Sequence, residues 1–420
     1  MKRQTALLGT KGAAGDTLKV ATALMAASAL LLLILLSGCT MLLLEDDLAG
    51  LTIAHTSDLL VIVDEDLYSS ITPYIDRYVR ELKSQNCSVN QALWQDGNTS
   101  DLKSIIRAYY EAQAIGGAFL VGALPCAWYE HEGFFGYEAF PCDVFFMDLN
   151  ADWQDADQDG IFDYHSTLDL DIFISRIDGS ADQIRWYFEK LHAYRTGVLS
   201  GDANAFIFKD NDWIDFEKGS TYGLENLFSN VSITDTIEET VKQEYLHKLS
   251  PAGPQYVYQW IHAYPSLLCI KEGDLYNYLY TSEISNNNLG GLFFNLFNCS
   301  ASRFTEENIA MTYLTGTDYG LATTGTTKPG GNYYPKAFHH LLSQGNTWGE
   351  AFRGWYNHYG VTDDKWFLGM VILGDPMLTI QPTVHKIMKT APLTQIPPDE
   401  EMVEELEHLL IEFIGSKLEL

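Results

Sequence analysis

Residues 58–64 read DLLVIVD, five consecutive apolar residues between acidic ones. Side chains of a strand alternate between its two faces, so an unbroken apolar run indicates a strand buried on both faces, as in a parallel sheet. Comparable runs recur at 118–122, 171–175, 205–208, 256–261 and 291–297. Stretches of helical spacing lie between or after them, and one of these predicts a helix at 305–314. This alternation predicts an α/β fold built around a largely parallel sheet.

The first 39 residues predict an export signal. Basic residues precede an apolar run at 20–36, and Leu-Ser-Gly-Cys follows at 36–39. That order is typical of a secretory signal, and its ending resembles the lipobox of bacterial lipoproteins, in which the cysteine, here Cys39, is acylated. The alternative is an uncleaved membrane anchor, because about 17–25 apolar residues span a bilayer. Either one places the rest of the chain outside the cytoplasm, anchored to the bacterial cell envelope.

The composition narrows the choice of partners. The 420 residues carry a formal net charge of −30, with 46% hydrophobic residues. A chain this acidic is repelled by nucleic acid and by anionic lipid headgroups, and its apolar content is too high for a disordered protein. Without Cys39, five cysteines remain, an odd number that predicts one free thiol. We expect Cys126 and Cys142, which enclose the shortest loop, to pair.

The chain divides into five predicted segments. A signal at 1–39 is followed by a linker at 40–57. An N-terminal α/β sub-domain spans 58–200 and a C-terminal α/β sub-domain spans 201–384. Residues 385–420 predict an acidic, amphipathic helical tail, most simply packed on the domain surface.

Two of the predicted strands end in residues that could carry chemistry. Residues 256–263 read YVYQWIHA and end at His262, and residues 292–300 read LFFNLFNCS and reach Cys299. Ligands of open α/β folds gather at the carboxyl ends of strands, and an imidazole that takes up the thiol proton makes a cysteine nucleophilic. Taken alone, a cysteine after a buried strand is more typical of an inert core residue.

Several short motifs, in order along the chain, resemble the gingipain-type family of caspase-like cysteine peptidases. The resemblance covers roughly residues 58–380, and it implies a caspase-like α/β/α sandwich of two sub-domains. His262 and Cys299 fall where that family has its catalytic pair. Beside the opening strand, the motifs are AFLVGA at 118–123, PCDVFFMD at 141–148, DLDIFISR at 169–176, TWGEA at 347–351 and LGDPML at 373–378.

The resemblance implies a cysteine endopeptidase that acts through a thioester acyl-enzyme. Cys299 would be the nucleophile and His262 the base, with the N–H groups of Ala263 and Cys299 holding the oxyanion. Asp171 would orient the imidazole, and Asp143 would have a structural or pocket role. The family usually has Gly after its catalytic His, and this chain has Ala263 instead.

The resemblance therefore implies a protein or peptide substrate and no organic cofactor. Given the family, an acidic pocket for Arg or Lys could be lined by Asp178 or Asp182. Two alternatives remain open. One is a catalytically inactive surface lipoprotein that acts as a calcium-dependent binding or scaffold protein. The other is a transfer enzyme that uses the same two residues, His262 and Cys299.

Residues 155–163 read DADQDGIFD and predict a structural calcium site. Asp155, Asp157, Asp159 and Asp163 occupy positions 1, 3, 5 and 9 of an EF-hand-like loop, with a glycine at position 6. Position 12 is a serine, so a further ligand is expected from elsewhere, Asp148 or Asp152 being candidates. The alternative is a solvated acidic turn.

Overall fold

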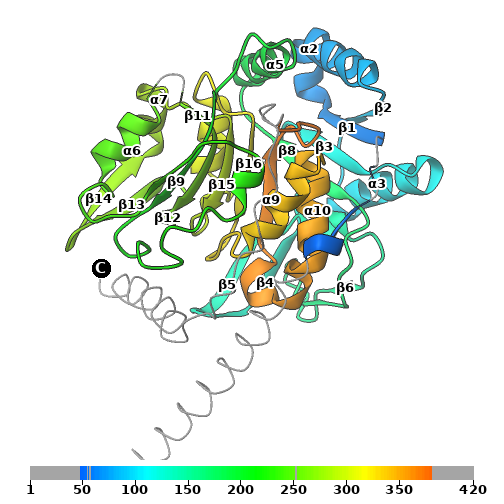
Figure 1. The fold of residues 1–420 in the computed structure, drawn as a ribbon. Helices are drawn as coiled ribbons and strands as arrows, with labels where there is room; N and C mark the ends of the chain where they lie inside the picture. Colours follow the sequence, from blue (N-terminus) through cyan, green and yellow to red (C-terminus); the bar gives the residue numbers. More distant parts are fainter. Residues whose placement is uncertain (1–47, 54, 56–57, 251–252, 381–420) are drawn as a thin grey trace, which may run out of the picture.

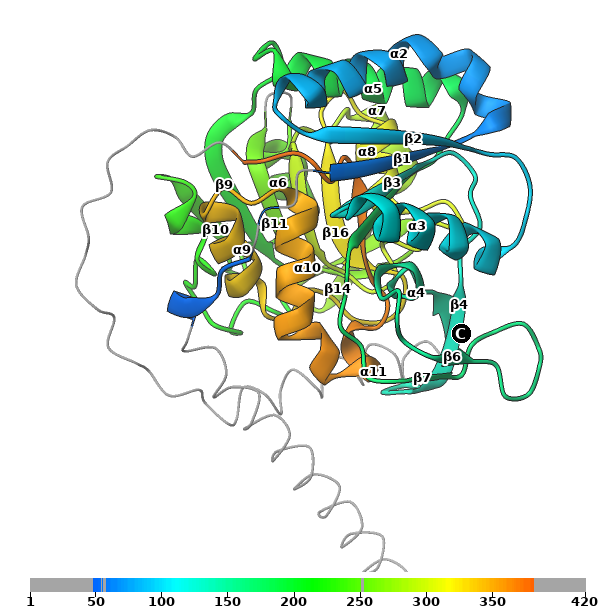
Figure 2. The same ribbon diagram turned by 90° about the vertical axis from the view of Figure 1, so that its right-hand side faces the viewer.

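The computed structural model describes residues 48–53, 55, 58–250 and 253–380. The expected signal, Cys39 and the C-terminal tail lie outside the described residues. Within them, the protein is a mixed α/β fold around one ten-stranded sheet, with helices on both faces (Figures 1 and 2). None of the described helices has the length and hydropathy needed to cross a bilayer.

The ten-stranded sheet consists of two parallel halves that run in opposite directions. The antiparallel pair β16–β17 joins them, and all other pairs are parallel. In the order of the sheet, one half contains β2 (Ser88–Trp94), β1 (Asp58–Asp64), β3 (Gly117–Val121), β8 (Phe173–Ile177) and β17 (Met370–Gly374). The other half contains β16 (Ala322–Thr326), β15 (Phe293–Phe297), β11 (Pro254–Trp260), β9 (Asp202–Lys209) and β10 (Val231–Thr234).

Helices pack on both faces of this sheet, and their ends follow from local sequence. Thr347 and Glu350 form a capping box at the start of α10, and Asn98 and Asp101 form one at the start of α3, each satisfying N–H groups that the first turn leaves open. The longer helices are α2 (Glu65–Ser84), α3 (Thr99–Gln113), α5 (Ala181–Arg195), α9 (Pro335–Ser343) and α10 (Trp348–His358). The shorter ones are α4 (Val144–Met147), α6 (Lys242–Lys248), α7 (Thr281–Asn286), α8 (Ile309–Thr315) and α11 (Asp364–Phe367).

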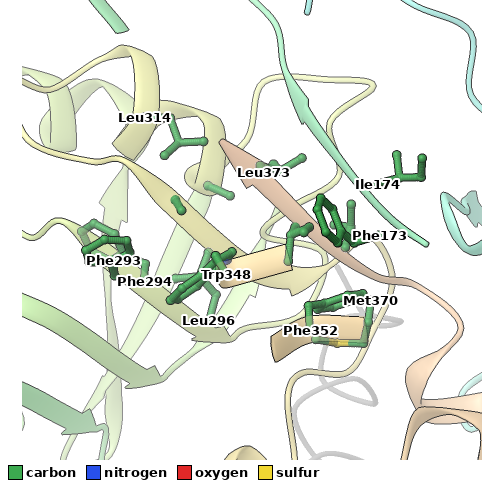
Figure 3. Packing of buried hydrophobic residues seen from close by; sticks show 14 of the residues in the cluster. Phe173, Ile174, Phe293, Phe294, Leu296, Leu314, Trp348, Phe352, Met370 and Leu373 are labelled. Atoms are coloured by element: carbon green, nitrogen blue, oxygen red, sulfur yellow. The ribbon is translucent and has the colours of Figure 1, made fainter. Parts of the chain in front are cut away.

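Buried aromatic and aliphatic residues of both halves meet beneath α10 (Figure 3). Trp348 of α10 lies with its ring 5.4 Å from that of Phe293 in β15, and its indole N–H donates to the carbonyl of Thr323 in β16. Phe173 of β8 packs against Gly349, where an added Cβ would come within 2.6 Å of the phenyl ring. The glycine of the TWGEA motif therefore lets α10 approach the middle of the sheet.

Three smaller sheets project from the main one. The hairpin β4–β5 (Trp128–Gly133 and Gly136–Pro141) and the short pair β6–β7 (Trp153–Gln154 and Tyr164–His165) follow β3 in sequence. The third contains β12 (His262–Tyr264), β13 (Leu267–Glu272) and β14 (Leu275–Tyr280), paired antiparallel in that order. Because β12 begins at His262, this small sheet starts at the residue predicted to be catalytic.

The predicted α/β/α architecture is confirmed, and two details differ. The helix expected at 305–314 begins at Ile309, because Asn308 provides its cap by accepting from the N–H of Met311. The expected pairing of Cys126 with Cys142 is wrong, since all five cysteines of the described residues are thiols. The fully buried Cys142 donates its thiol hydrogen to the carbonyl of Leu368.

Candidate active site

His262 and Cys299 emerge side by side from two neighbouring parallel strands. Trp260 of β11 is paired with Phe297 of β15. These are the last residues of the two strands, and each candidate lies two residues further along the chain. Neighbouring strands are about 4.8 Å apart. The side-chain amide of Asn298 connects the two segments just beyond the strands, because it donates to the carbonyl of Ile261 at 2.5 Å. The structure thus brings the two predicted residues to the same place on one edge of the sheet.

The carboxylate that contacts the imidazole belongs to Asp212. Its Oδ2 lies 3.1 Å from Nε2 of His262 and accepts a hydrogen bond of 2.8 Å from the hydroxyl of Tyr276. The ammonium of Lys271 lies 3.9 Å from its other oxygen. Burial raises the pKa of Asp212, but the bonds and charges of these three partners outweigh it, so the pKa lies below its ordinary value. Asp212 is therefore a carboxylate at neutral pH and holds the imidazole by Nε2.

Asp210 fixes the main chain around this pair. Its fully buried carboxyl group accepts from the backbone N–H groups of Asp212, Lys271 and His262. Burial raises the pKa of Asp210 well above its ordinary value. One side chain thus connects the loop after β9, the strand β13 and His262 itself, which positions the imidazole relative to Asp212.

Aromatic rings enclose the imidazole. The ring of Trp213 lies 5.0 Å from that of His262 and 5.6 Å from that of Phe297. Trp260 and Phe297, directly beneath the two candidates on the strands, stack with centroids 3.9 Å apart. Both side chains are shielded from solvent, since His262 is 1% exposed and Cys299 is 9% exposed. A low local dielectric strengthens the hydrogen bond between Asp212 and His262.

The segment after Cys299 is anchored from two directions. Ser300 has a φ of 57°, in the left-handed region, and its N–H donates to the carbonyl of Lys328 at 2.9 Å. The buried ammonium of Lys328 lies 2.7 Å from Oε1 of Glu138, a residue of β5. Burial lowers the pKa of Lys328. The hairpin β4–β5 therefore braces the loop that carries the thiol.

Ala263 occupies the place where the resembled family usually has Gly. It lies in β12 and is not among the described residues with positive φ. An L-residue adopts such a backbone without strain. The departure from Gly therefore does not distort the chain that would present the Ala263 N–H.

Asp171 and Asp143, also singled out by the sequence, make other contacts. The carboxylate of Asp171 accepts from the N–H of Leu149 at 2.8 Å and from the amide of Asn150 at 3.1 Å. The imidazole thus has a different carboxylate partner from the expected one. Asp143 forms a buried two-point pair with Arg176, at 2.6 and 2.8 Å, which is a structural role.

Asp178 and Asp182, the candidates for a basic-residue pocket, follow the carboxyl end of β8. Because β8 runs opposite to β15, that end lies at the sheet edge away from Cys299. Asp182 is paired with Arg185 on the surface of α5. Neither aspartate is therefore placed to line a pocket beside the thiol.

The loop at 155–163 brings its aspartate side chains close together around a tight turn. Asp155 accepts from the N–H groups of Gln158 and Gly160, and Gly160 has a φ of 97°, which favours glycine. The carboxylate oxygens of Asp155, Asp157 and Asp159 lie within 4.8 Å of one another. Oxygen ligands in such a ring suit a hard cation.

A further carboxylate near this loop belongs to Glu130 of β4, and not to Asp148 or Asp152, the candidates from the sequence. The carboxylate of Glu130 lies within 4.8 Å of those of Asp157 and Asp163. Asp148 binds the backbone N–H groups of Asn150, Ala151 and Asp169, so its oxygens are directed into its own loop. Asp152 accepts from the side-chain amide of Gln154.

The sequence alone did not single out Asp210, Asp212 or Lys328. The one available signal was position, because Asp210 and Asp212 directly follow the strand predicted at 205–208. Polar residues at the carboxyl end of a strand next to the strand of His262 are candidates for the same site. That adjacency became known only from the sheet order, in which β9 lies beside β11.

Comparisons with known proteins bear on the family. The sequence model of the family described as "Peptidase family C25" matches residues 53–381. Comparison with curated proteins finds no match. A solved structure described as "Crystal structure of transcription regulator like protein from Staphylococcus haemolyticus" aligns over 78% of this chain and 100% of its own, at 8% identity. Its TM-score of 0.16 is too low to carry any argument.

Proposed function

Because the chain belongs to peptidase family C25, we propose that it is a cysteine endopeptidase with Cys299 as nucleophile and His262 as base, and that Asp212 orients the imidazole. Family membership supports a cysteine peptidase. The roles of the residues rest on one observation. Paired positions of β11 and β15 deliver His262 and Cys299 to the same edge of the sheet, where His262 is hydrogen-bonded to the partly buried carboxylate of Asp212.

The proposed chemistry follows from which imidazole nitrogen Asp212 occupies. Since Nε2 bonds to Asp212, Nδ1 takes the thiol proton of Cys299. The thiolate then attacks the scissile carbonyl carbon, and the oxyanion receives hydrogen bonds from the backbone N–H groups of Ala263 and Cys299. The protonated Nδ1 delivers its proton to the leaving amine, which leaves a thioester on Cys299. Water, deprotonated by Nδ1, hydrolyses the thioester and restores the thiol.

The competing candidate is a surface binding protein that retains the fold without the activity. The observation in its favour is the near-complete burial of His262 and Cys299. A peptidase must admit a peptide bond to both residues. The two candidates therefore differ in whether peptide is cleaved at the thiol.

The test incubates the protein, with calcium and mild reductant, with a diverse peptide mixture and identifies cleavage products by mass spectrometry. Cys299→Ala is treated in parallel, and Cys126→Ala serves as a matched thiol control. Cuts made by the wild type and by Cys126→Ala, and absent with Cys299→Ala, support the peptidase. A folded wild type that makes no cut supports the binding protein.

Two further proposals concern the setting of the domain. We propose that Cys39 is acylated after export, which would place the domain at the cell envelope on a lipid anchor. The support is the order of charge, apolar run and Leu-Ser-Gly-Cys at the N-terminus. Metabolic labelling with a fatty-acid analogue tests it, since Cys39→Ala removes the label if the proposal holds.

We also propose that the loop 155–163, together with Glu130, binds a structural calcium ion. The donor set consists entirely of carboxylate oxygens in two overlapping groups, as calcium prefers. Bound there, the ion would hold the loop against the hairpin β4–β5. It takes no part in the proposed reaction.

A further inference from the structure

One face of the small sheet β12–β13–β14 continues directly from the imidazole. His262 is paired with Cys269, and Cys269 is paired with Tyr278. Two residues further along β12, Tyr264 is paired with Leu267, which is paired with Tyr280. Residues that pair directly across antiparallel strands project from the same face, as do residues two apart on one strand. Tyr264, Tyr278 and Tyr280 therefore share the face of His262, and we call these three residues the tyrosine face.

The two faces of this small sheet differ sharply in exposure. On the opposite face, Ala263, Leu268 and Leu279 are buried. The tyrosine face is open to solvent in its outer part, with Tyr264 at 38%, Tyr278 at 45% and Tyr280 at 47% exposure. Three partly exposed aromatic side chains thus lie in two cross-strand rows, one of which begins at the imidazole itself.

The proposed role of His262 predicts which part of a substrate contacts the tyrosine face. The imidazole protonates the leaving amine, so it lies on the side of the scissile bond that carries the leaving group, called the primed side. The small sheet begins at His262 and extends from it by two further strands. Two spacings of about 4.8 Å place Tyr278 roughly 10 Å from His262, the length of about three extended residues.

We propose that the tyrosine face binds the three or so substrate residues on the primed side of the scissile bond. This inference rests on the proposed peptidase function, and it adds the contact that would select the primed residues of the substrate. Tyrosine offers a rigid apolar ring with a polar tip, which suits apolar or aromatic side chains together with peptide groups. The occupant is therefore an extended peptide with apolar or aromatic primed residues.

The test compares two substrates that share the same unprimed sequence. One is an internally quenched peptide with Leu and Phe on the primed side. The other ends in aminomethylcoumarin directly after the scissile bond and has no primed residues. For the double variant Tyr278→Ser/Tyr280→Ser, the ratio of kcat/KM for the long peptide to that for the coumarin substrate falls roughly tenfold.

The matched control is Trp186→Ser, which replaces an aromatic residue of α5 that is 47% exposed. This variant is expected to keep the wild-type ratio of the two kcat/KM values. An unchanged ratio in the tyrosine double variant overturns the proposal. Equal losses on both substrates also overturn it, because they show a general effect on the site.

A second readout separates this proposal from the peptidase proposal. If the wild type cleaves neither substrate, the peptidase proposal fails. The labelled long peptide is then titrated by fluorescence anisotropy against Cys299→Ala, with and without the two tyrosine replacements. Binding weakened at least several-fold by the replacements supports the tyrosine face as a peptide site. Equal binding, or no binding to either protein, overturns it.

Discussion

Replacing Asp212 by Asn is the most informative perturbation of the site, because it removes a charge and keeps the shape. The carboxylate bonds to Nε2 of His262 at 3.1 Å and to Tyr276 at 2.8 Å. A hydrogen bond to a charged group is worth about 1.5–3 kcal/mol. If the imidazolium of the transition state loses that amount, kcat/KM falls about 10- to 150-fold.

The same substitution is also expected to shift the pH dependence of kcat/KM, in a direction that the charge of Asp212 determines. The negative charge of Asp212 stabilises the imidazolium of His262, so its loss lowers the pKa of that imidazole. The alkaline limb of kcat/KM, where imidazolium is lost, therefore moves to lower pH in Asp212→Asn. Because the pKa of Asp212 is itself lowered, its carboxylate is charged at neutral pH. Its contribution disappears only as the pH falls through that lowered value.

Two matched variants complete the assay, which measures kcat/KM between pH 5 and 9 on one peptide substrate. Tyr276→Phe removes a neutral donor and keeps the charge, so activity falls only about twofold to tenfold and the alkaline limb stays in place. Asp171→Asn leaves the alkaline limb unchanged. If Asp171→Asn moves that limb and Asp212→Asn does not, the assignment of Asp212 is refuted in favour of Asp171.

Other predictions concern stability. Arg176→Met leaves the buried carboxylate of Asp143 unpaired and lowers the free energy of unfolding in urea by about 3–5 kcal/mol; an unchanged midpoint would show that the pair is dispensable. Burial lowers the pKa of His339 to about 4, so the fold loses up to about 3 kcal/mol as the pH falls from 6.5 to 4. His339→Gln removes this slope and His340→Gln retains it, whereas equal slopes in all three proteins would contradict the assignment. Calcium raises the Tm of the chelated protein by several degrees, and Asp155→Asn abolishes the rise; a Tm indifferent to calcium would identify a solvated turn.

The fold could be predicted because its information is local. Each long apolar run marks a buried strand, and Thr347 with Glu350 marks a helix start three residues apart. The sequence also predicts that His262 and Cys299 each follow such a strand. That the two residues lie together was implied by the resemblance to the gingipain-type family, because the pairing of β11 with β15 is not a local property of the sequence.

Asp212 illustrates what could not be predicted. It lies in a polar stretch, Lys209 to Asp212, that reads like any solvated loop. It reaches His262 only because β9 pairs with β11. Hydrophobic patterning predicts the individual strands but does not determine their order in the sheet. The tyrosine face was missed for a related reason. Its alternation is visible only once the turn between β13 and β14 fixes the register.

The most direct test of the account is to trap the acyl-enzyme. The protein is mixed with a peptide ester for a few seconds, quenched in acid and digested, and the peptides are examined by mass spectrometry. The account predicts an acyl adduct on the peptide that contains Cys299, reduced in Asp212→Asn and absent in Cys299→Ala. An adduct on another cysteine such as Cys126, or none from a substrate that is being cleaved, would contradict the assignment of Cys299 as the nucleophile.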